Sequence, residues 1–214
     1  MENTNRENNM ENIVEEIVAM EWAQFQNTSN IGGRASCQDD WEEFHTMRKA
    51  QFNAWSEELL ASYHDDLARA KEEGRNLLTE KYAYMMKSTM PERFAYLAPE
   101  LPPISEEKQA LVDEIAAIQT QWSVEFALKY PHVAGRGRAI HADTDTAYAT
   151  SVETYTKGEM LTYSTPTLRV YRDYMKQLLA EGKNMVYEIR NNTVKTMGYA
   201  DVAAAEAEMV YRFE

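Results

Sequence analysis

The sequence contains an internal repeat, and this feature restricts the possible folds more than any other. The stretch EEGRNLLTEKY (72–82) matches AEGKNMVYEIR 108 positions later, and GRASCQD (33–39) matches GRAIHAD 104 positions later. VEEIVAM (14–20) matches VDEIAAI at an offset of 98. The matches keep one order while the offset grows, which is expected when the loops of a second copy take small insertions. We therefore predict a duplicated fold.

A proline-rich stretch, YLAPELPPIS (96–105), separates the two copies, because its three prolines disfavour helix and stiffen a connector. The predicted segments are a disordered polar N-terminus at 1–10, a first helical repeat at 11–98, a connector at 99–104 and a second helical repeat at 105–214. Repeats of this size keep apolar surface to share, so we expect them to pack as one compact body.

Both copies predict helix. Only eight glycines and six prolines occur in 214 residues, and short alternating runs are rare. Apolar residues recur at spacings of three and four in segments that begin with capping residues. The predicted helices are 11–27, 40–54, 57–73, one after Asn76, a short one capped by Thr89, 105–130, 145–161, 166–181, one after Asn184 and 200–212. The expected fold class is all-α, an internally duplicated helical bundle of two four-helix-like halves about a pseudo-two-fold axis.

The composition limits the possible partners. The formal net charge of −13 argues against nucleic acid and against an anionic membrane surface. No apolar run approaches the ~18 residues of a spanning helix, no signal pattern opens the chain, and one cysteine can form no internal disulfide. We expect a cytoplasmic protein. Twelve methionines and thirteen tyrosines suit either a core or a homodimer interface.

Two glycine–arginine loops, GGRASCQDD (32–40) and its counterpart in AGRGRAIH, are the first candidate site. An arginine fork beside the first backbone N–H groups of a helix can hold a carboxylate or a phosphate. Alternatively, the aspartates cap the following helices and pair with the arginines, which would tie each loop down internally. The candidate ligand-binding residues in these loops are Arg34, Asp39, Asp40, Arg136, Arg138 and Asp143.

Cys37 and His141 occupy matching positions in the two loops. A thiol at a helix start beside an arginine can ionise readily and act as a nucleophile, and His141 would be its base if the loops meet. A small buried thiol without chemistry is the alternative reading of Cys37. These two residues are therefore catalytic candidates.

Metal and cofactor chemistry lack a complete pattern. Glu42 and His45 have the spacing found in helical di-iron sites, but the sequence offers no second such pair and no set of zinc ligands. No phosphate-cradling glycine signature occurs, so the sequence predicts no metal site and leaves any cofactor unknown.

The stretch TSVETYTKGEM (150–160) is polar where a helix should face the core. A polar face opposite an apolar copy would create an asymmetric pocket between the repeats. A solvated helix face is the other interpretation. The acid–base candidates here are Glu153, Tyr155 and Glu159, and Arg48 and Gln51, which stand among apolar residues of the first copy, are further ligand-binding candidates.

The motifs GGRASCQDD, GRNLLTEKY and TSVETYTKGE resemble a bacterial family of all-helical proteins of unknown function, over most of the chain from about residue 11. The resemblance implies an all-helical fold and no known reaction, so it assigns no catalytic role. The sequence departs from the family pattern at Thr156 and Lys157, where leucine and arginine are expected before Gly158.

Three functional hypotheses follow. The first is an enzyme that acts on a small polar or anionic metabolite in a site between the repeats. The second is a regulatory or binding module that senses a ligand or docks a protein. The third is an interaction protein that uses its acidic surface as a mimic. We favour the first, because polar residues embedded in apolar helices reduce stability unless they serve a function.

Overall fold

The computed structural model describes residues 2–29 and 33–211, with side chains at 8–29 and 33–209. Met1, residues 30–32 and residues 212–214 lie outside these ranges. Gly32 belongs to the first glycine–arginine loop, Met1 to the predicted disordered N-terminus and residues 212–214 to the predicted second repeat.

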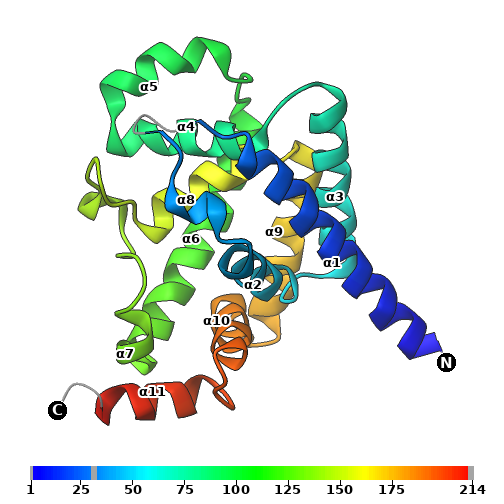
Figure 1. Cartoon of the computed structure of the whole chain (residues 1–214), viewed down its shortest axis with the longest axis vertical. Coiled ribbons are helices and arrows are strands. Elements are labelled where there is room, and N and C mark those ends of the chain that lie inside the picture. The colour runs from blue at the N-terminus through cyan, green and yellow to red at the C-terminus, as the bar shows by residue number, and fades with distance from the viewer. Residues whose placement is uncertain (1, 30–32, 212–214) are drawn as a thin grey trace.

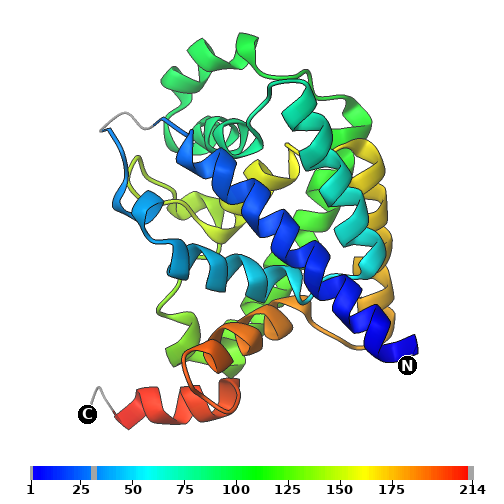
Figure 2. The ribbon, with the colours of Figure 1, turned by 45° about the vertical axis from the view of Figure 1, so that its right-hand side comes forward.

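The described part of the chain is all-helical, as predicted, and contains no strand. An isolated bridge joins Thr146 to Ala149. Figures 1 and 2 show the first helix crossing one face of the molecule, with a short helix near one end and the C-terminal helix at the other.

The first half holds four long helices and shorter turns. These elements are α1 (Glu2–Gln26), η1 (Ser36–Asp39), α2 (Trp41–Phe52), α3 (Glu57–Glu72), α4 (Leu77–Thr89), α5 (Pro91–Leu97) and η2 (Ala98–Glu100). Helix α1 begins at Glu2, so it includes most of the segment predicted to be disordered. Extending a helix that packing has already nucleated costs little. The predicted cap at Thr89 is wrong: Met90 takes the cap position ahead of Pro91, and the Thr89 hydroxyl donates to the Met85 carbonyl.

The second half repeats this order with different connections. Its elements are α6 (Glu106–Lys129), α7 (Pro131–Ala134), η3 (Ala142–Thr144), α8 (Val152–Met160), α9 (Thr165–Ala180), α10 (Met185–Thr196) and α11 (Val202–Tyr211). The helix predicted from 145 starts only at Val152, because Ser151 caps it by accepting from the Thr154 N–H. The carboxylate of Asp145 in turn accepts from the Ser151 N–H at 2.6 Å and holds the preceding turn.

The helix contacts of the two halves correspond. Helix α1 packs on α2, α3 and α4, and α6 packs on α8, α9 and α10. Between the halves, α4 packs on α8, α10 packs on α2, and α3 packs on α9. For these eight helices, exchanging each one for its counterpart in the other half therefore returns the same set of contacts.

Local contacts correspond as well. Asn76 caps α4 and its side chain donates to the Gln24 carbonyl at 2.8 Å, whereas Asn184 caps α10 and donates to the Trp122 carbonyl at 3.2 Å. Gly74 and Gly182 end the preceding helices with φ of 69° and 67°. Only glycine adopts this left-handed conformation without strain, so each half needs its glycine at this point.

One apolar core extends through both halves. The rings of Tyr63 and Tyr163 lie 4.6 Å apart at its centre, and Trp55 contacts both of them. Its large, fully buried side chains include Ile17, Phe52, Leu59, Leu60, Leu67, Ile115, Met160, Leu168 and Met175. A smaller cluster around Phe126, Tyr130 and Val202 seats α11 on α6 and α7.

Candidate functional site

A pocket of about 510 Å³ lies between the two halves. This volume is within the usual range for small-molecule sites. Its walls come from the first glycine–arginine loop and α2 on one side, and from α6, the second glycine–arginine loop, α8 and α10 on the other. The predicted site residues that line it are Cys37, Asp40, Arg48, Gln51, Arg136, Arg138, Tyr155 and Glu159.

The first glycine–arginine loop is tied down internally, as its alternative interpretation predicts. Arg34 Nε donates to Asp39 Oδ1 at 2.8 Å, and Arg34 Nη2 donates to the Gln38 carbonyl at 2.7 Å. Asp40 caps α2 by accepting from the Glu43 N–H at 2.9 Å. The structure therefore places Arg34 and Asp39 outside the pocket lining, while Asp40 reaches its edge.

The second loop has different contacts. Glu153 accepts from the Ala142 N–H at 3.1 Å and from Lys157 Nζ at 2.9 Å, and these two hydrogen bonds lower the pKa of Glu153. His141 lies near this carboxylate and is not among the residues that line the pocket, whereas Cys37 is. Asp143 lies within η3 and is exposed, and the cap of α8 is Ser151.

Arg48 is held by two buried carboxylates. Its Nε donates to Glu21 Oε2 and its Nη2 donates to Glu21 Oε1, both at 2.6 Å, which forms a bidentate pair. Arg48 Nη2 also lies 2.8 Å from Glu159 Oε1. Lys81 Nζ lies 3.1 Å from the same Glu159 oxygen. Two cations and two carboxylates therefore form a neutral network at the pocket floor, in which Glu21 is 1% exposed.

The network keeps Glu159 ionised. Burial alone would raise the pKa of this carboxyl, but the charges of Arg48 and Lys81 outweigh burial and lower the pKa of Glu159 to about 2. A general acid or base operating at neutral pH has a pKa near 7. The geometry therefore favours an ion-pairing role for Glu159 over proton transfer.

Gln51 completes the polar floor. Its side-chain oxygen accepts from Arg48 Nη1 at 2.9 Å, and its Nε2 donates to Glu159 Oε2 at 3.4 Å. Both ends of the amide are engaged in these two contacts. These contacts use two of the four hydrogen-bonding positions of the amide, so Gln51 helps to orient the ion pairs and stays a candidate ligand-binding residue.

Tyr155 lies between two cations. Lys81 Nζ is 3.7 Å from the centre of its ring, and the Arg138 guanidinium carbon is 4.9 Å from it. Such contacts stabilise a cation over an aromatic face by about 0.5–2 kcal/mol. Tyr155 therefore helps to position Arg138 beside the pocket.

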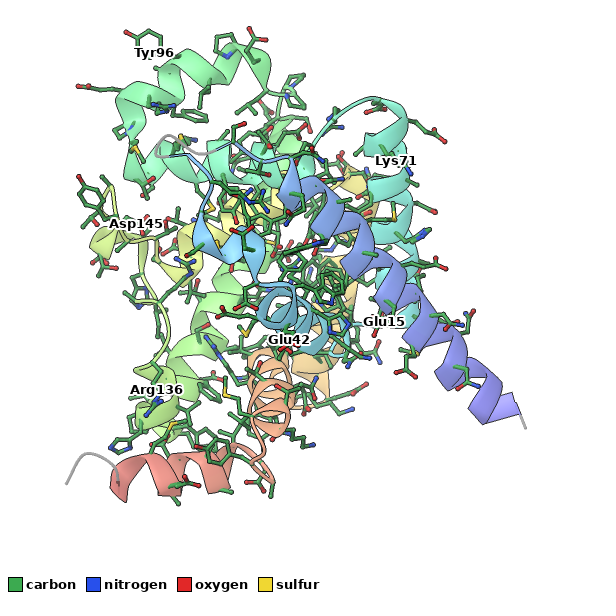
Figure 3. All side chains as sticks on the ribbon, in the orientation of Figure 1. Glu15, Glu42, Lys71, Tyr96, Arg136 and Asp145 are labelled. Atoms are coloured by element: carbon green, nitrogen blue, oxygen red, sulfur yellow. The ribbon has the colours of Figure 1, made fainter. Side chains whose placement is uncertain are left out.

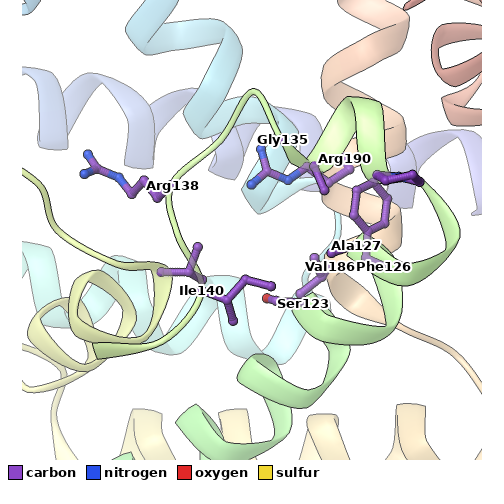
Figure 4. Close-up of a pocket in the computed structure, with 11 residues that line it drawn as sticks. Ser123, Phe126, Ala127, Gly135, Arg138, Ile140, Val186 and Arg190 are labelled. Atoms are coloured by element: carbon purple, nitrogen blue, oxygen red, sulfur yellow. The ribbon is translucent and has the colours of Figure 1, made fainter. Parts of the chain in front are cut away.

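Two arginines on the second-half wall lack a carboxylate partner among the described residues. Arg138 Nη1 donates only to the Thr150 carbonyl, at 3.2 Å. Arg190 of α10 has no hydrogen bond or ion pair with any described residue, and burial lowers the pKa of its guanidinium. Figure 4 shows both side chains at a neighbouring cavity, and Figure 3 places Arg136 by α7.

Sequence reasoning missed Glu21, Lys81 and Arg190. Each stands in an ordinary helix with other charged residues nearby, so its burial is not visible in the local pattern. A comparison of matching positions in the two halves does point to Lys81 and Arg190. Lys81 corresponds to Ile189, and Arg190 corresponds to Tyr82, so both matched pairs place a charged residue opposite an uncharged one.

The His45 ring, which has the di-iron spacing to Glu42, pairs with a carboxylate of α1: its Nε2 lies 2.7 Å from Glu15 Oε2. Within the described ranges, no group of three or more histidine, cysteine, aspartate or glutamate residues could hold a metal ion. No helix in the same ranges is long and apolar enough to cross a membrane.

Comparison with known proteins gives one match. The sequence model of a family described as "Protein of unknown function (DUF4125)" matches residues 11–207, the extent expected from the resemblance. Neither the curated proteins nor the solved structures give a significant match. Because the match covers nearly the whole chain, this protein belongs to the DUF4125 family of unknown function.

Proposed function

We propose that this protein binds a small anionic molecule in the pocket between its halves, with Arg138 and Arg190 holding the anion. The observation that carries the proposal is Arg190. Its side chain is half-buried, lines the pocket and has no acceptor among the described residues. Partial burial of an unpaired charge is costly, so a ligand acceptor is the simplest reason to keep it.

The charge distribution supports this proposal. The protein carries a net charge of −13, so carboxylates are abundant elsewhere. At Arg48 two carboxylates neutralise the guanidinium, whereas Arg138 and Arg190 have none among the described residues. Two guanidinium groups in one cleft attract an anion and can bind it through paired N–H donors.

Binding is a better account than catalysis. The strongly shifted groups at the pocket have pKa values far from neutrality, at about 2 for Glu159 and about 12 for Tyr82, whose phenol is buried. Acid–base enzymes move such values toward the working pH. The enzyme hypothesis now depends on Cys37, which is exposed and not the small buried thiol of the alternative reading, and on Tyr155. Both line the wall, and His141, the base predicted for Cys37, is not among the lining residues.

We also infer that the two halves arose by duplication and pack about a pseudo-two-fold axis. The reciprocal helix contacts support this view, since a two-fold axis makes every contact between copies occur in pairs. Gln51 and Glu159, which correspond at an offset of 108, hydrogen-bond to each other across the pocket floor. A contact between matching positions is expected beside such an axis.

Titration calorimetry of the wild type and an Arg190→Met variant with inorganic phosphate and acetate tests the binding proposal. We expect the variant to bind at least about tenfold more weakly, because hydrogen bonds to charged groups contribute about 1.5–3 kcal/mol. The unliganded variant should be at least as stable as the wild type, since it loses an unpaired, half-buried charge. Arg93→Met, an exposed position on α5, is the matched control. Equal affinities for wild type and Arg190→Met would refute the proposal.

A further inference from the structure

We infer that the bound molecule is an amphiphilic acid, with a carboxylate or phosphate head between Arg138 and Arg190 and a small apolar group in a second cavity. This inference rests on the proposed anion site and adds the chemical class of the ligand. The second cavity has a volume of about 290 Å³ and shares both arginines with the larger pocket (Figure 4).

The second cavity is apolar beyond its two arginines. Phe126 and Ala127 of α6, Ile140 of the loop and Val152 and Val186 form its walls, together with the chain around α7. Among the residues that the structure describes, no carboxylate, lysine or histidine lines it. The Ser123 hydroxyl at its edge already donates to the Gln119 carbonyl at 2.8 Å. The cavity therefore offers charge at one side and only apolar surface at the other.

The combination of two guanidinium groups with apolar walls distinguishes between classes of ligand. A small, wholly polar anion would satisfy Arg190 but leave the apolar walls in contact with water. An uncharged hydrophobic molecule would bury those walls but leave Arg190 without an acceptor. Only a molecule with both parts satisfies the two features, because burial of apolar surface and pairing of the guanidinium each contribute favourably.

The volume limits the apolar part. A cavity of about 150 Å³ with apolar walls accommodates benzene. The 290 Å³ found here has room for one aromatic ring with a short extension, or for a short alkyl chain. A long acyl chain does not fit within this volume, so we expect an aryl or short alkyl acid.

A homologous series of straight-chain carboxylates, from acetate to decanoate, tests the inference on the wild-type protein. Affinity should rise about three- to fourfold for each added methylene until the cavity is full. This factor corresponds to the free energy of about 0.8 kcal/mol gained when one methylene moves from water into an apolar site. Phenyl phosphate tests the other head group, and it should bind more tightly than inorganic phosphate. The series requires no substitution, so folding of a variant does not affect it.

A pair of variants locates the apolar group. Ala127→Phe places a ring into the second cavity and should abolish the dependence on chain length while acetate still binds. Leu128→Phe on the same helix is the control, because Leu128 is 81% exposed. Arg190-dependent binding of phosphate with no gain along the series would overturn the amphiphile inference and leave the anion site intact. No Arg190-dependent binding of any acid would overturn both.

Discussion

Replacing Glu159 by glutamine removes one negative charge from the buried network and changes the shape of the side chain little. Lys81 then loses its carboxylate partner, and Arg48 keeps only Glu21. Removing one member of a buried ion pair typically destabilises a protein by about 3–5 kcal/mol, because the remaining charge is uncompensated. For a chain of this length, that loss corresponds to a fall in melting temperature of about 6–20 °C.

The lowered pKa of Glu159 gives a second value for the stability that the ion pairs of this carboxylate contribute. A change from 4.5 in the unfolded chain to about 2 in the fold corresponds to about 3 kcal/mol, at 1.36 kcal/mol per pH unit. This stabilisation is fully present above about pH 4.5 and is lost as the pH falls through about 2, because the carboxyl then protonates in both states. The stability difference between wild type and variant should therefore shrink in acid.

Urea unfolding of both proteins at pH 7, 4 and 3 measures this difference. The control is Glu107→Gln, which removes an exposed carboxylate that pairs with Arg169 and should change stability by under about 1 kcal/mol. Adding Lys81→Met to Glu159→Gln should recover part of the loss, since the unpaired ammonium is then absent. A loss below about 1 kcal/mol at pH 7, or a difference that does not shrink in acid, would refute the reasoning.

Two further predictions concern the supports of the pocket. The Glu206 carboxylate of α11 accepts the N–H groups of His132 and Val133 at the start of α7, so Glu206→Gln should destabilise the fold by about 1–2 kcal/mol and speed amide exchange at Val133. Because these contacts lower the pKa of Glu206, the loss should diminish as the pH falls through that pKa. A Cβ at Gly158 would lie 2.6 Å from Met85 Cγ, so Gly158→Ala should separate α8 from α4 and cost about 1–3 kcal/mol in thermal or urea unfolding.

The sequence predicts the start of a helix correctly where a capping residue stands at a clear break in the apolar pattern. Ser56, Ser105 and Asn184 cap α3, α6 and α10 as their sequence positions indicate. The start of α8 was misplaced because its cap, Ser151, stands inside a polar run that has no clear break. The sequence does not reveal that Asp145 holds the preceding turn, because that contact forms only in the folded loop.

The candidate site was only partly predictable, for a physical reason. The repeat and the polar face pointed to a pocket between the halves, and Arg48, Gln51 and Arg138 all line it. The charges that govern the pocket depend on partners brought from far along the chain. Glu21 and Lys81 become important only because α1 and α4 pack beside α2 and α8, which no single window of sequence reveals.

Matching positions in the two halves differ in charge at the pocket. Glu21 and Gln119 match at an offset of 98, and each hydrogen-bonds the hydroxyl of the matching tyrosine, Tyr63 or Tyr171.

In the first half the Glu21 carboxylate also binds Arg48, and this long side chain fills the space beside it. In the second half the amide of Gln119 carries no charge, and the position that matches Arg48 is Thr156, which is short. Both Gln119 and Thr156 line the pocket. The second-half wall therefore has a short threonine and an uncharged amide where the first half has an arginine paired with a carboxylate, and Arg138 and Arg190 line the pocket beside them.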